Sequence, residues 1–237
     1  MNQKAQAWAE EARKAFLEPI PPDEVAGVID NTLLHPEATP AHVEEFVENS
    51  LKYPFRSIVV GPNMVDVARD AIGEERMPLV SVVGFPMGFH SLEVKMKEAE
   101  QLVKAGVSEI DYVINLSLAK QKDFGGLERE TKALLSFGVP LKAILECGLL
   151  SEDEKEGAAK ALASAGVSFV KTSTGFLAGG ATLYDVALLH FAVEGTGCGV
   201  KASGGIRTLE DLQRMRLAGA DVIGTSSGIR IVQEAFR

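Results

Sequence analysis

From residue 28 onward the chain alternates short apolar runs with longer amphipathic segments. The apolar runs end in Gly, Pro, Asn or Thr, and apolar positions in the segments that follow recur at helical spacing. This pattern predicts strands over 28–33, 57–60, 79–83, 108–114, 142–146, 168–171, 199–201 and 221–223. It predicts helices over about 40–52, 62–72, 91–105, 126–137, 151–165, 182–194, 208–218 and 227–236.

Eight strand–helix units at this length are typical of a closed parallel (β/α)8 barrel. Gly106, Gly166 and Gly219 each follow a predicted helix and come just before a strand, where a left-handed residue commonly ends the helix. A doubly wound open sheet uses similar junctions but rarely needs so many units in so few residues. We therefore predict an α/β protein with a TIM barrel over residues 27–237.

Residues 1–26 precede this repeat and predict an additional N-terminal helix. Trp8, Ala12, Ala15 and Phe16 recur at helical spacing, with charged residues on the opposite face. The proline-rich segment 18–22 then ends the helix. We expect this extension to pack on the barrel or on another subunit, and we expect a homo-oligomer, either a dimer or a tetramer.

The composition excludes several classes of protein. The 237 residues are 46% hydrophobic, and 24 Lys and Arg stand against 33 Asp and Glu, for a net charge of −9. Such a chain is too apolar to be disordered, and its apolar runs are too short to span a membrane. Its acidic balance does not suit nucleic acid. With only two cysteines and no signal-like start, we expect a cytoplasmic protein with neither membrane nor nucleic-acid partners.

Charged residues occur inside the predicted strands. Side chains alternate in direction along a strand, so Asp111 shares the inner face with Glu109 while Tyr112 points outward. Further charged positions of this kind are Asp30, Lys142, Glu146, Lys171 and Lys201. Each alone fits a solvated rim or an internal ion pair, but together they cost desolvation free energy that a structural core avoids. For Lys142 and Glu146 two interpretations stay open, an ion pair that orients Asp111 or a pair that only satisfies itself.

Lys171 and Lys201 end neighbouring predicted strands, which lie roughly 4.8 Å apart in a sheet. Burial and like charge both disfavour an ammonium ion, so one of these lysines should have a low pKa. A neutral amine attacks carbonyl carbon to form a Schiff base, which withdraws electrons while a C–C bond breaks. Asp111 suits the proton transfers of such an aldol reaction.

Three loops after the late predicted strands are rich in Gly, Ser and Thr. They cover residues 172–175, 203–205 and 224–228. Phosphate sites in barrels commonly use such loops, because glycine lets backbone N–H groups approach the anion and hydroxyl groups add donors. Any one loop is compatible with an ordinary tight turn, whereas the three together predict a phosphate site.

Several segments closely resemble the deoxyribose-phosphate aldolases, in order from about residue 27 to the C-terminus. They are IDNTLL at 29–34, VVGFP at 82–86, EIDYV at 109–113, FVKTSTG at 169–175, VKASGGIR at 200–207 and IGTSSG at 223–228. The resemblance implies a class I aldolase without metal or other cofactor. Its substrates would be a small phosphorylated sugar and aldehydes, with 2-deoxy-D-ribose 5-phosphate reversibly cleaved to D-glyceraldehyde 3-phosphate and acetaldehyde.

The resemblance also implies roles for single residues. Lys171 would form the Schiff base, Lys201 would lower the pKa of Lys171 and help to move protons, and Asp111 would relay protons. Substrate would be bound by Asp30, Thr32, Thr172, Gly175, Gly204, Gly205, Ser226 and Ser227. Of these, Asp30 and Thr32 would contact substrate hydroxyls, and the glycines and serines would line the phosphate site.

The chain departs from the family pattern at a few positions. Asn31 and His35 replace a His and a Lys of the first motif, Val59 stands where Cys is frequent, and Cys147 where Thr is frequent. Phe176 stands where some relatives place a Lys that meets phosphate. The missing Lys bears on affinity for a phosphorylated substrate, and the missing Cys removes one site of inactivation by aldehydes.

Two other functions fit parts of the pattern. A different phosphosugar barrel, either an isomerase or another Schiff-base aldolase, would also use the late glycine-rich loops. The paired lysines disfavour a plain isomerase, which needs a carboxylate base and no imine. A non-catalytic barrel that binds a phosphorylated ligand would lose its chemical residues first, yet Asp111, Lys171 and Lys201 are all present.

Overall fold

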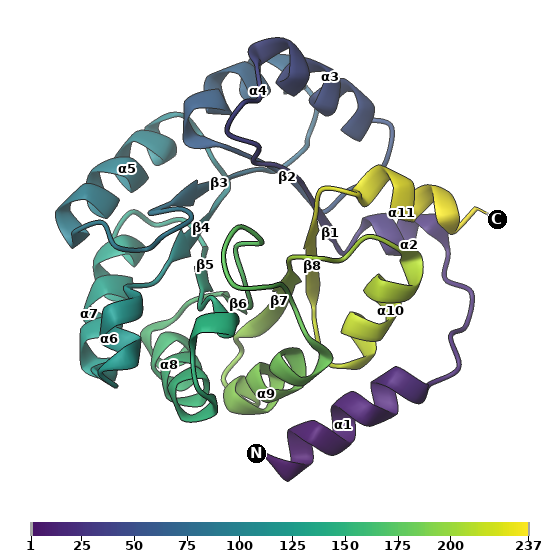
Figure 1. Cartoon of the computed structure of the whole chain (residues 1–237). Coiled ribbons are helices and arrows are strands. Elements are labelled where there is room, and N and C mark those ends of the chain that lie inside the picture. Colours follow the sequence, from purple (N-terminus) through teal and green to yellow (C-terminus); the bar gives the residue numbers. More distant parts are fainter. Residues whose placement is uncertain (1, 237) are drawn as a thin grey trace.

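The computed structural model describes residues 2–236 and shows parallel strands closed into a barrel inside a ring of helices (Figure 1). The strands are β1 (Ile29–Leu33), β2 (Ser57–Val60), β3 (Leu79–Val83), β4 (Glu109–Val113), β5 (Leu141–Ile144), β6 (Phe169–Lys171), β7 (Gly199–Ser203) and β8 (Val222–Thr225). They pair in chain order, and β8 closes on β1. The predicted barrel is confirmed, and the doubly wound open sheet is excluded.

The helices that follow the strands agree with the predicted segments to within a few residues. They are α3 (Pro40–Ser50), α4 (Val65–Ile72), α5 (Leu92–Lys104), α7 (Phe124–Leu135), α8 (Glu152–Ala165), α9 (Leu183–Val193), α10 (Leu209–Leu217) and α11 (Gly228–Glu234), with short 3₁₀ turns η1 (Pro62–Met64) and η2 (Cys147–Leu149). The sequence did not predict α2 (Pro22–Ala26) or α6 (Leu116–Lys120). Each has only five residues, which is too short to display a helical period.

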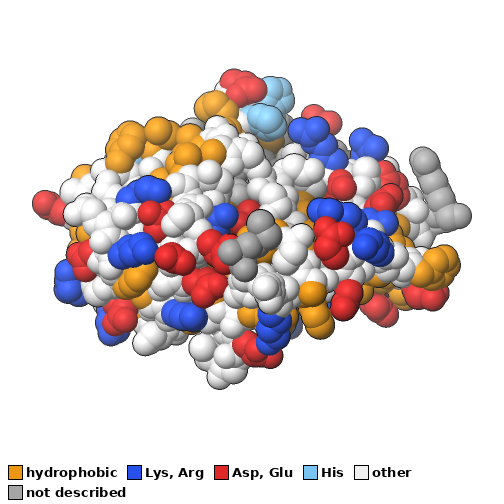
Figure 2. All heavy atoms as spheres, turned by 60° about the horizontal axis from the view of Figure 1, so that its bottom comes forward, with side chains coloured by type: hydrophobic (Ala, Val, Ile, Leu, Met, Phe, Trp, Pro, Cys, Tyr) orange, Lys and Arg blue, Asp and Glu red, His pale blue; other side chains and the backbone are white. Residues whose placement is uncertain are grey.

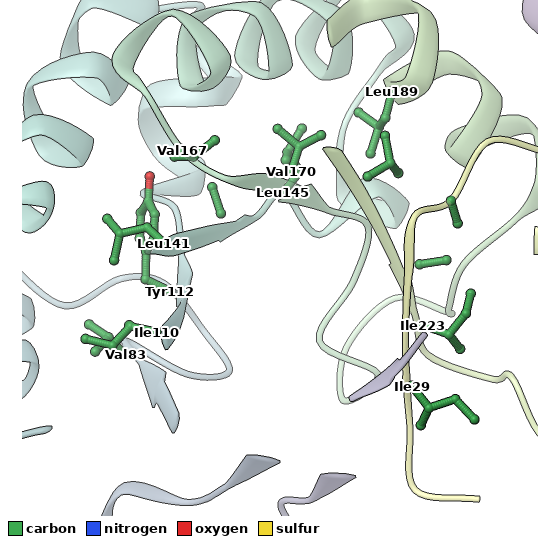
Figure 3. Close-up of a cluster of buried hydrophobic side chains, with 14 of the residues drawn as sticks. Ile29, Val83, Ile110, Tyr112, Leu141, Leu145, Val167, Val170, Leu189 and Ile223 are labelled. Atoms are coloured by element: carbon green, nitrogen blue, oxygen red, sulfur yellow. The ribbon is translucent and has the colours of Figure 1, made fainter. Parts of the chain in front are cut away.

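The main hydrophobic core lies between the outer face of the barrel and the helices. Figure 3 shows Ile29, Ile110, Leu141 and Ile223 in this layer, all of them fully buried. Tyr112 points into the same layer, as predicted, and its hydroxyl lies 2.7 Å from Oγ1 of Thr131 on α7. Because strand residues alternate, this apolar outer face leaves the intervening residues to fill the inside of the barrel.

The N-terminal helix α1 (Gln3–Lys14) lies outside the barrel, against α9 and α10 (Figure 1). Its buried residues are Ala5, Ala9 and Ala12, whereas Trp8 is 40% and Phe16 is 83% exposed. The predicted apolar face is therefore only partly right, because small alanines make the close contact and Phe16 lies beyond the end of the helix. The division into an extension, 1–26, and a barrel, 27–237, stays a prediction.

The outer surface mixes charges of both signs, and Figure 2 shows Lys and Arg side chains next to Asp and Glu. Many of these form pairs one helical turn apart, such as Glu100 with Lys104 at 2.6 Å. Within residues 2–236, no helix combines the length and the apolar character that crossing a membrane requires.

The predicted glycine junctions adopt the expected left-handed backbone. Gly106, Gly166 and Gly219 have φ angles of 85°, 104° and 110°. At Gly219 the space is also restricted, because a Cβ atom there would lie 2.6 Å from Cγ of His190 on α9. The glycine therefore permits both the backbone turn and the close packing of α10 on α9.

We expect Gly219→Ala to lower the free energy of unfolding more than Gly138→Ala does. Both glycines have positive φ, which costs an alanine about 1–2 kcal/mol. A Cβ at Gly138 would meet no described atom within 4 Å, so the difference between the variants isolates the clash with His190. Urea unfolding of both variants measures it. Equal losses would show that His190 moves aside at no cost.

Candidate active site

The inside of the barrel holds a layer of buried charged side chains around Asp111. Lys171 of β6 and Lys201 of β7 are directly paired in the strand register, at matching heights as the sequence predicted. Their Nζ atoms bind the same atom, Oδ2 of Asp111, at 2.8 and 2.7 Å. Asp111 and Lys201 are fully buried, whereas Lys171 retains 4% exposure. Two lysines thus share one carboxylate oxygen.

Asp30 and Lys142 extend this layer. Lys201 Nζ also donates to Oδ2 of Asp30 at 2.6 Å. Lys142 Nζ donates to Oδ1 of Asp111 at 3.0 Å, forms an ion pair with Glu109, and lies 3.7 Å from Oδ2 of Asp30. Lys142 therefore holds the second oxygen of Asp111, and both oxygens of this carboxylate are occupied by lysines.

Glu146 does not pair with Lys142, so both interpretations of that pair were wrong. Its backbone has a φ of 53°, and its Oε2 accepts hydrogen bonds from the backbone N (3.0 Å) and Oγ1 (2.5 Å) of Thr174. Thr174 Oγ1 accepts in turn from the backbone N of Phe176. A left-handed residue leaves the extended conformation, and strand alternation then no longer predicts where its side chain points. Glu146 instead holds the loop after β6.

Arg56, which immediately precedes β2, binds the cluster near the N-terminal ends of the strands. Its Nη1 donates to Oδ1 of Asp30 at 2.7 Å, and Nη1 and Nη2 donate to the two carboxylate oxygens of Glu109 at 3.0 and 2.7 Å. Its guanidinium also lies over the ring of Phe169, 5.3 Å from the ring centroid. Arg56 was not predicted from the sequence, because it stands outside the predicted strand 57–60.

Burial and neighbouring charges together set the pKa values of the cluster. Burial disfavours the ionised form of Asp111, but the ammonium groups of Lys142, Lys171 and Lys201 outweigh it and hold its pKa well below the usual range. For Lys171, burial lowers the pKa to about 8, against the opposing effect of Asp111 and with the help of Lys201. The predicted low lysine pKa is thus found at Lys171.

A cavity of about 280 Å³ opens at the C-terminal ends of the strands, and Lys171 lines it. The same cavity is lined by the glycine-rich loops, which contribute Gly175, Gly204, Gly205 and Ser226, and by Thr32 of β1. Figure 1 shows the loop after β6 in front of the barrel opening. The three loops singled out by composition therefore meet at one site, with the candidate nucleophile among them.

Three predicted substrate-binding residues are absent from the lining of this cavity. Asp30 is fully buried in the charged cluster. Thr172 exchanges hydrogen bonds with the backbone of Ser203, both at 3.1 Å. Ser227 donates its backbone N–H to Oγ1 of Thr225 and precedes α11. These contacts place the three residues beneath or beside the cavity, and their binding roles stay predictions.

Comparison with known proteins identifies the family. A model of the DeoC/LacD family aldolases matches residues 25–234. The chain belongs to this family. Similar curated relatives include the deoxyribose-phosphate aldolases of Thermoanaerobacter sp. (strain X514), 42% identical over 215 residues that cover 89% of this chain and 96% of the relative, and of Caldanaerobacter subterraneus subsp. tengcongensis, 43% identical over 215 residues that cover 89% and 93%.

Solved structures agree with this assignment to the DeoC/LacD family. An aldolase called QR15 superposes with a TM-score of 0.85 at 38% identity and covers 90% of this chain and 96% of its own. A deoxyribose phosphate aldolase from Aeropyrum pernix, described as a unique tetramer, superposes with a TM-score of 0.84 at 33% identity and covers 98% and 97%.

One further residue of this DeoC/LacD site, Arg207, was missed in the sequence, whereas Phe176 had been noted there as a departure from the family pattern. Arg207 lines the cavity beside Gly205, and a cation next to a glycine-rich loop was the signal that could have identified it. Phe176 also lines the cavity, and its ring stands edge-on to that of Phe85, with 5.3 Å between the centroids. Arg207 is thus a cation at the position where the predicted anion site lies.

We expect stability to depend on pH through Lys171. In the unfolded chain a lysine has a pKa of about 10.4, whereas the folded value here is about 8. Between these values the unfolded chain binds more protons, so the free energy of unfolding increases as pH rises through this window. The pKa shift corresponds to about 3 kcal/mol.

Urea unfolding of the wild type and of Lys171→Met at pH 7.5, 9 and 10 isolates this contribution, because other titrating groups are common to both proteins. The wild type should gain stability relative to the variant as pH rises. A difference that stays constant across this range would contradict a lowered pKa at Lys171.

Proposed function

We propose that this chain is a deoxyribose-phosphate aldolase that reversibly cleaves 2-deoxy-D-ribose 5-phosphate to D-glyceraldehyde 3-phosphate and acetaldehyde. The observation that carries the proposal is the position of Lys171. Its amine, with a pKa lowered by burial, lines a cavity whose walls are the glycine-rich loops. Curated relatives with this name match the chain over 89% of its length.

The chemistry starts from the neutral amine of Lys171. The amine attacks C1 of the open-chain sugar, and loss of water gives an imine. Protonated imine withdraws the electrons of the C2–C3 bond while the C3 hydroxyl gives up its proton, which releases D-glyceraldehyde 3-phosphate and leaves an enamine. Protonation of the enamine at C2 and addition of water to the imine then release acetaldehyde and restore the lysine.

Proton transfer falls to Asp111 and Lys201. Asp111 Oδ2 lies within hydrogen-bond distance of both lysine Nζ atoms, so a proton can pass between the reacting nitrogen and Lys201 through this oxygen. Asp30 and Lys142 hold the pair in place by binding Lys201 and the other oxygen of Asp111. These buried contacts orient the relay before substrate binds, which reduces the reorganisation needed during the reaction.

The late loops are the site at which we expect the phosphate of the substrate to bind. Gly204 and Gly205 have φ angles of 93° and 81°, and because they lack a Cβ atom their backbone can approach a bound anion closely. Arg207 adds a positive charge at the same cavity. With C1 at Lys171 and the phosphate at these loops, the bond that breaks lies near Asp111 and Lys201.

We further propose a homo-oligomer that works in the cytoplasm. The relative from Aeropyrum pernix is a tetramer, and the exposed rings of Trp8 on α1 and of Phe16 just after it offer apolar surface. Cys147 and Cys198 are free thiols, which fits a reducing compartment.

Trapping with borohydride tests the Schiff base. We expect 2-deoxy-D-ribose 5-phosphate and borohydride, in the presence of EDTA, to leave a reduced adduct on Lys171 that peptide mass spectrometry locates. Lys171→Leu should lose both adduct and turnover while keeping its circular dichroism spectrum. Lys132→Leu, at an exposed lysine of α7, should keep both.

A folded protein that binds the sugar without forming an adduct would instead be a binding protein or an imine-free isomerase. Turnover that disappears in EDTA and returns with zinc would indicate a metal-dependent aldolase.

Arg207→Ala tests the phosphate site. A charge-assisted hydrogen bond contributes about 1.5–3 kcal/mol, so we expect KM for 2-deoxy-D-ribose 5-phosphate to rise roughly 10- to 100-fold. The kcat/KM for unphosphorylated 2-deoxy-D-ribose should change little. Arg230→Ala, at an exposed arginine of α11 paired with Glu234, is the matched control. Equal losses with both sugars would contradict a phosphate contact.

A further inference from the structure

The charged cluster inside the barrel holds an excess of one cation. Among residues 2–236, the side chains joined to it by hydrogen bonds or ion pairs are the cations Arg56, Lys142, Lys171 and Lys201 and the carboxylates Asp30, Glu109 and Asp111. An uncompensated charge is costly in a buried site. Loss of a single proton would bring the cluster to electrical balance.

Lys171 is the member best placed to lose that proton. Its ammonium group contacts a single carboxylate of the cluster, Asp111, whereas Lys201 contacts Asp30 as well as Asp111. Lys142 contacts both of these aspartates and Glu109 besides. Lys171 is also the lysine that lines the cavity, where a released proton reaches solvent.

Arg56 supplies the excess from the far side of the cluster. Ion pairs join it to Lys171 through Asp30, Lys201 and Asp111, and also through Glu109, Lys142 and Asp111. Arg56 neutralises part of the negative charge of Asp30 and Glu109. These two carboxylates therefore stabilise the ammonium groups of Lys142 and Lys201 less, and Asp111 must stabilise them more. That carboxylate is the same one that stabilises the ammonium form of Lys171.

We propose that Arg56 is a positioning residue that favours the neutral amine of Lys171 through Asp30 and Glu109, without contacting Lys171 itself. The proposal rests on the Schiff-base function proposed for Lys171 and assigns that site a new residue. Arginine suits this task because a guanidinium does not lose its proton in the working range of a protein. The positive charge of Arg56 therefore stays constant while Lys171 titrates.

The other groups around Lys171 do not supply this charge. In the described part of the chain, the other titratable groups near this site include Glu146 on the loop after β5, and His35 and Arg207, which line the cavity with Lys171. Arg207 is exposed, so solvent screens its charge more strongly than that of Arg56, whose side chain is 22% exposed.

The proposal predicts opposite effects of two neutralising substitutions. Arg56→Gln leaves equal numbers of cations and carboxylates in the described cluster, so the pKa of Lys171 should rise. Glu109→Gln removes a carboxylate and increases the excess, so that pKa should fall. We expect shifts of about half to one pH unit each, since charges in such sites interact with an effective dielectric constant of about 20. A purely structural role would move both variants in the same direction.

The pKa of Lys171 can be measured without turnover. Acetaldehyde and cyanoborohydride alkylate the neutral amine, and peptide mass spectrometry of the full-length protein gives the rate at Lys171 from pH 5 to pH 10. The wild type should show a midpoint near 8, as set by the lowered pKa. Arg56→Lys, which keeps the charge, and Arg230→Gln, which removes an exposed arginine, should keep this midpoint.

An unchanged midpoint in Arg56→Gln, or shifts of the same sign in Arg56→Gln and Glu109→Gln, would overturn the proposal. If Arg56→Gln does not fold, Glu109→Gln decides alone, with a lower midpoint supporting the proposal and an unchanged one overturning it. The assay is independent of aldol cleavage. A wild type that traps acetaldehyde at Lys171 without cleaving 2-deoxy-D-ribose 5-phosphate would therefore refute the proposed function and still test Arg56.

Discussion

The carboxylate of Asp111 is the contact on which the inside of this barrel depends. Its Oδ2 binds Lys171 and Lys201, and its Oδ1 binds Lys142. Several lysines without such an acceptor would repel one another in a space that excludes water, and the strands could not bring them together. The position of Asp111 thus determines that these positive charges are tolerated together inside the barrel.

Closure of the barrel makes this arrangement possible from residues far apart in the chain. Asp30 and Lys201 are 171 positions apart, yet they meet because β8 pairs with β1 and β7 pairs with β8. Gly224 of β8 leaves room for the Lys201 side chain, since a Cβ there would lie 2.9 Å from its Cε. The apolar outer faces of the same strands bind the helices, so packing energy outside the barrel supports the polar contacts inside it.

Alternation along regular strands explains what the sequence could predict, and departures from regularity explain what it could not. Asp111, Lys171 and Lys201 lie in strands, where side chains alternate in direction with a period of two. This alternation was enough to predict that they lie inside the barrel. Arg56 immediately precedes β2 and still contacts the cluster through Asp30. Glu146 was predicted to join the cluster, but its backbone has a positive φ and its side chain points elsewhere. Neither position carries a periodic signal. Arg207 was visible in a glycine-rich motif, but only the folded loop shows that it lines the cavity.

The charge balance of the cluster links reactivity to stability. A folded pKa of about 8 means that, near neutral pH, Lys171 is protonated at a cost that the unfolded chain does not have. This cost follows from burial and from the neighbouring positive charges, and the same two factors make the amine available to a carbonyl group. A barrel with balanced charges would be more stable at neutral pH, and its lysine would be a poorer nucleophile. The guanidinium of Arg56, bound to Asp30 and Glu109 away from the cavity, allows this excess to be maintained without occupying space that the substrate needs.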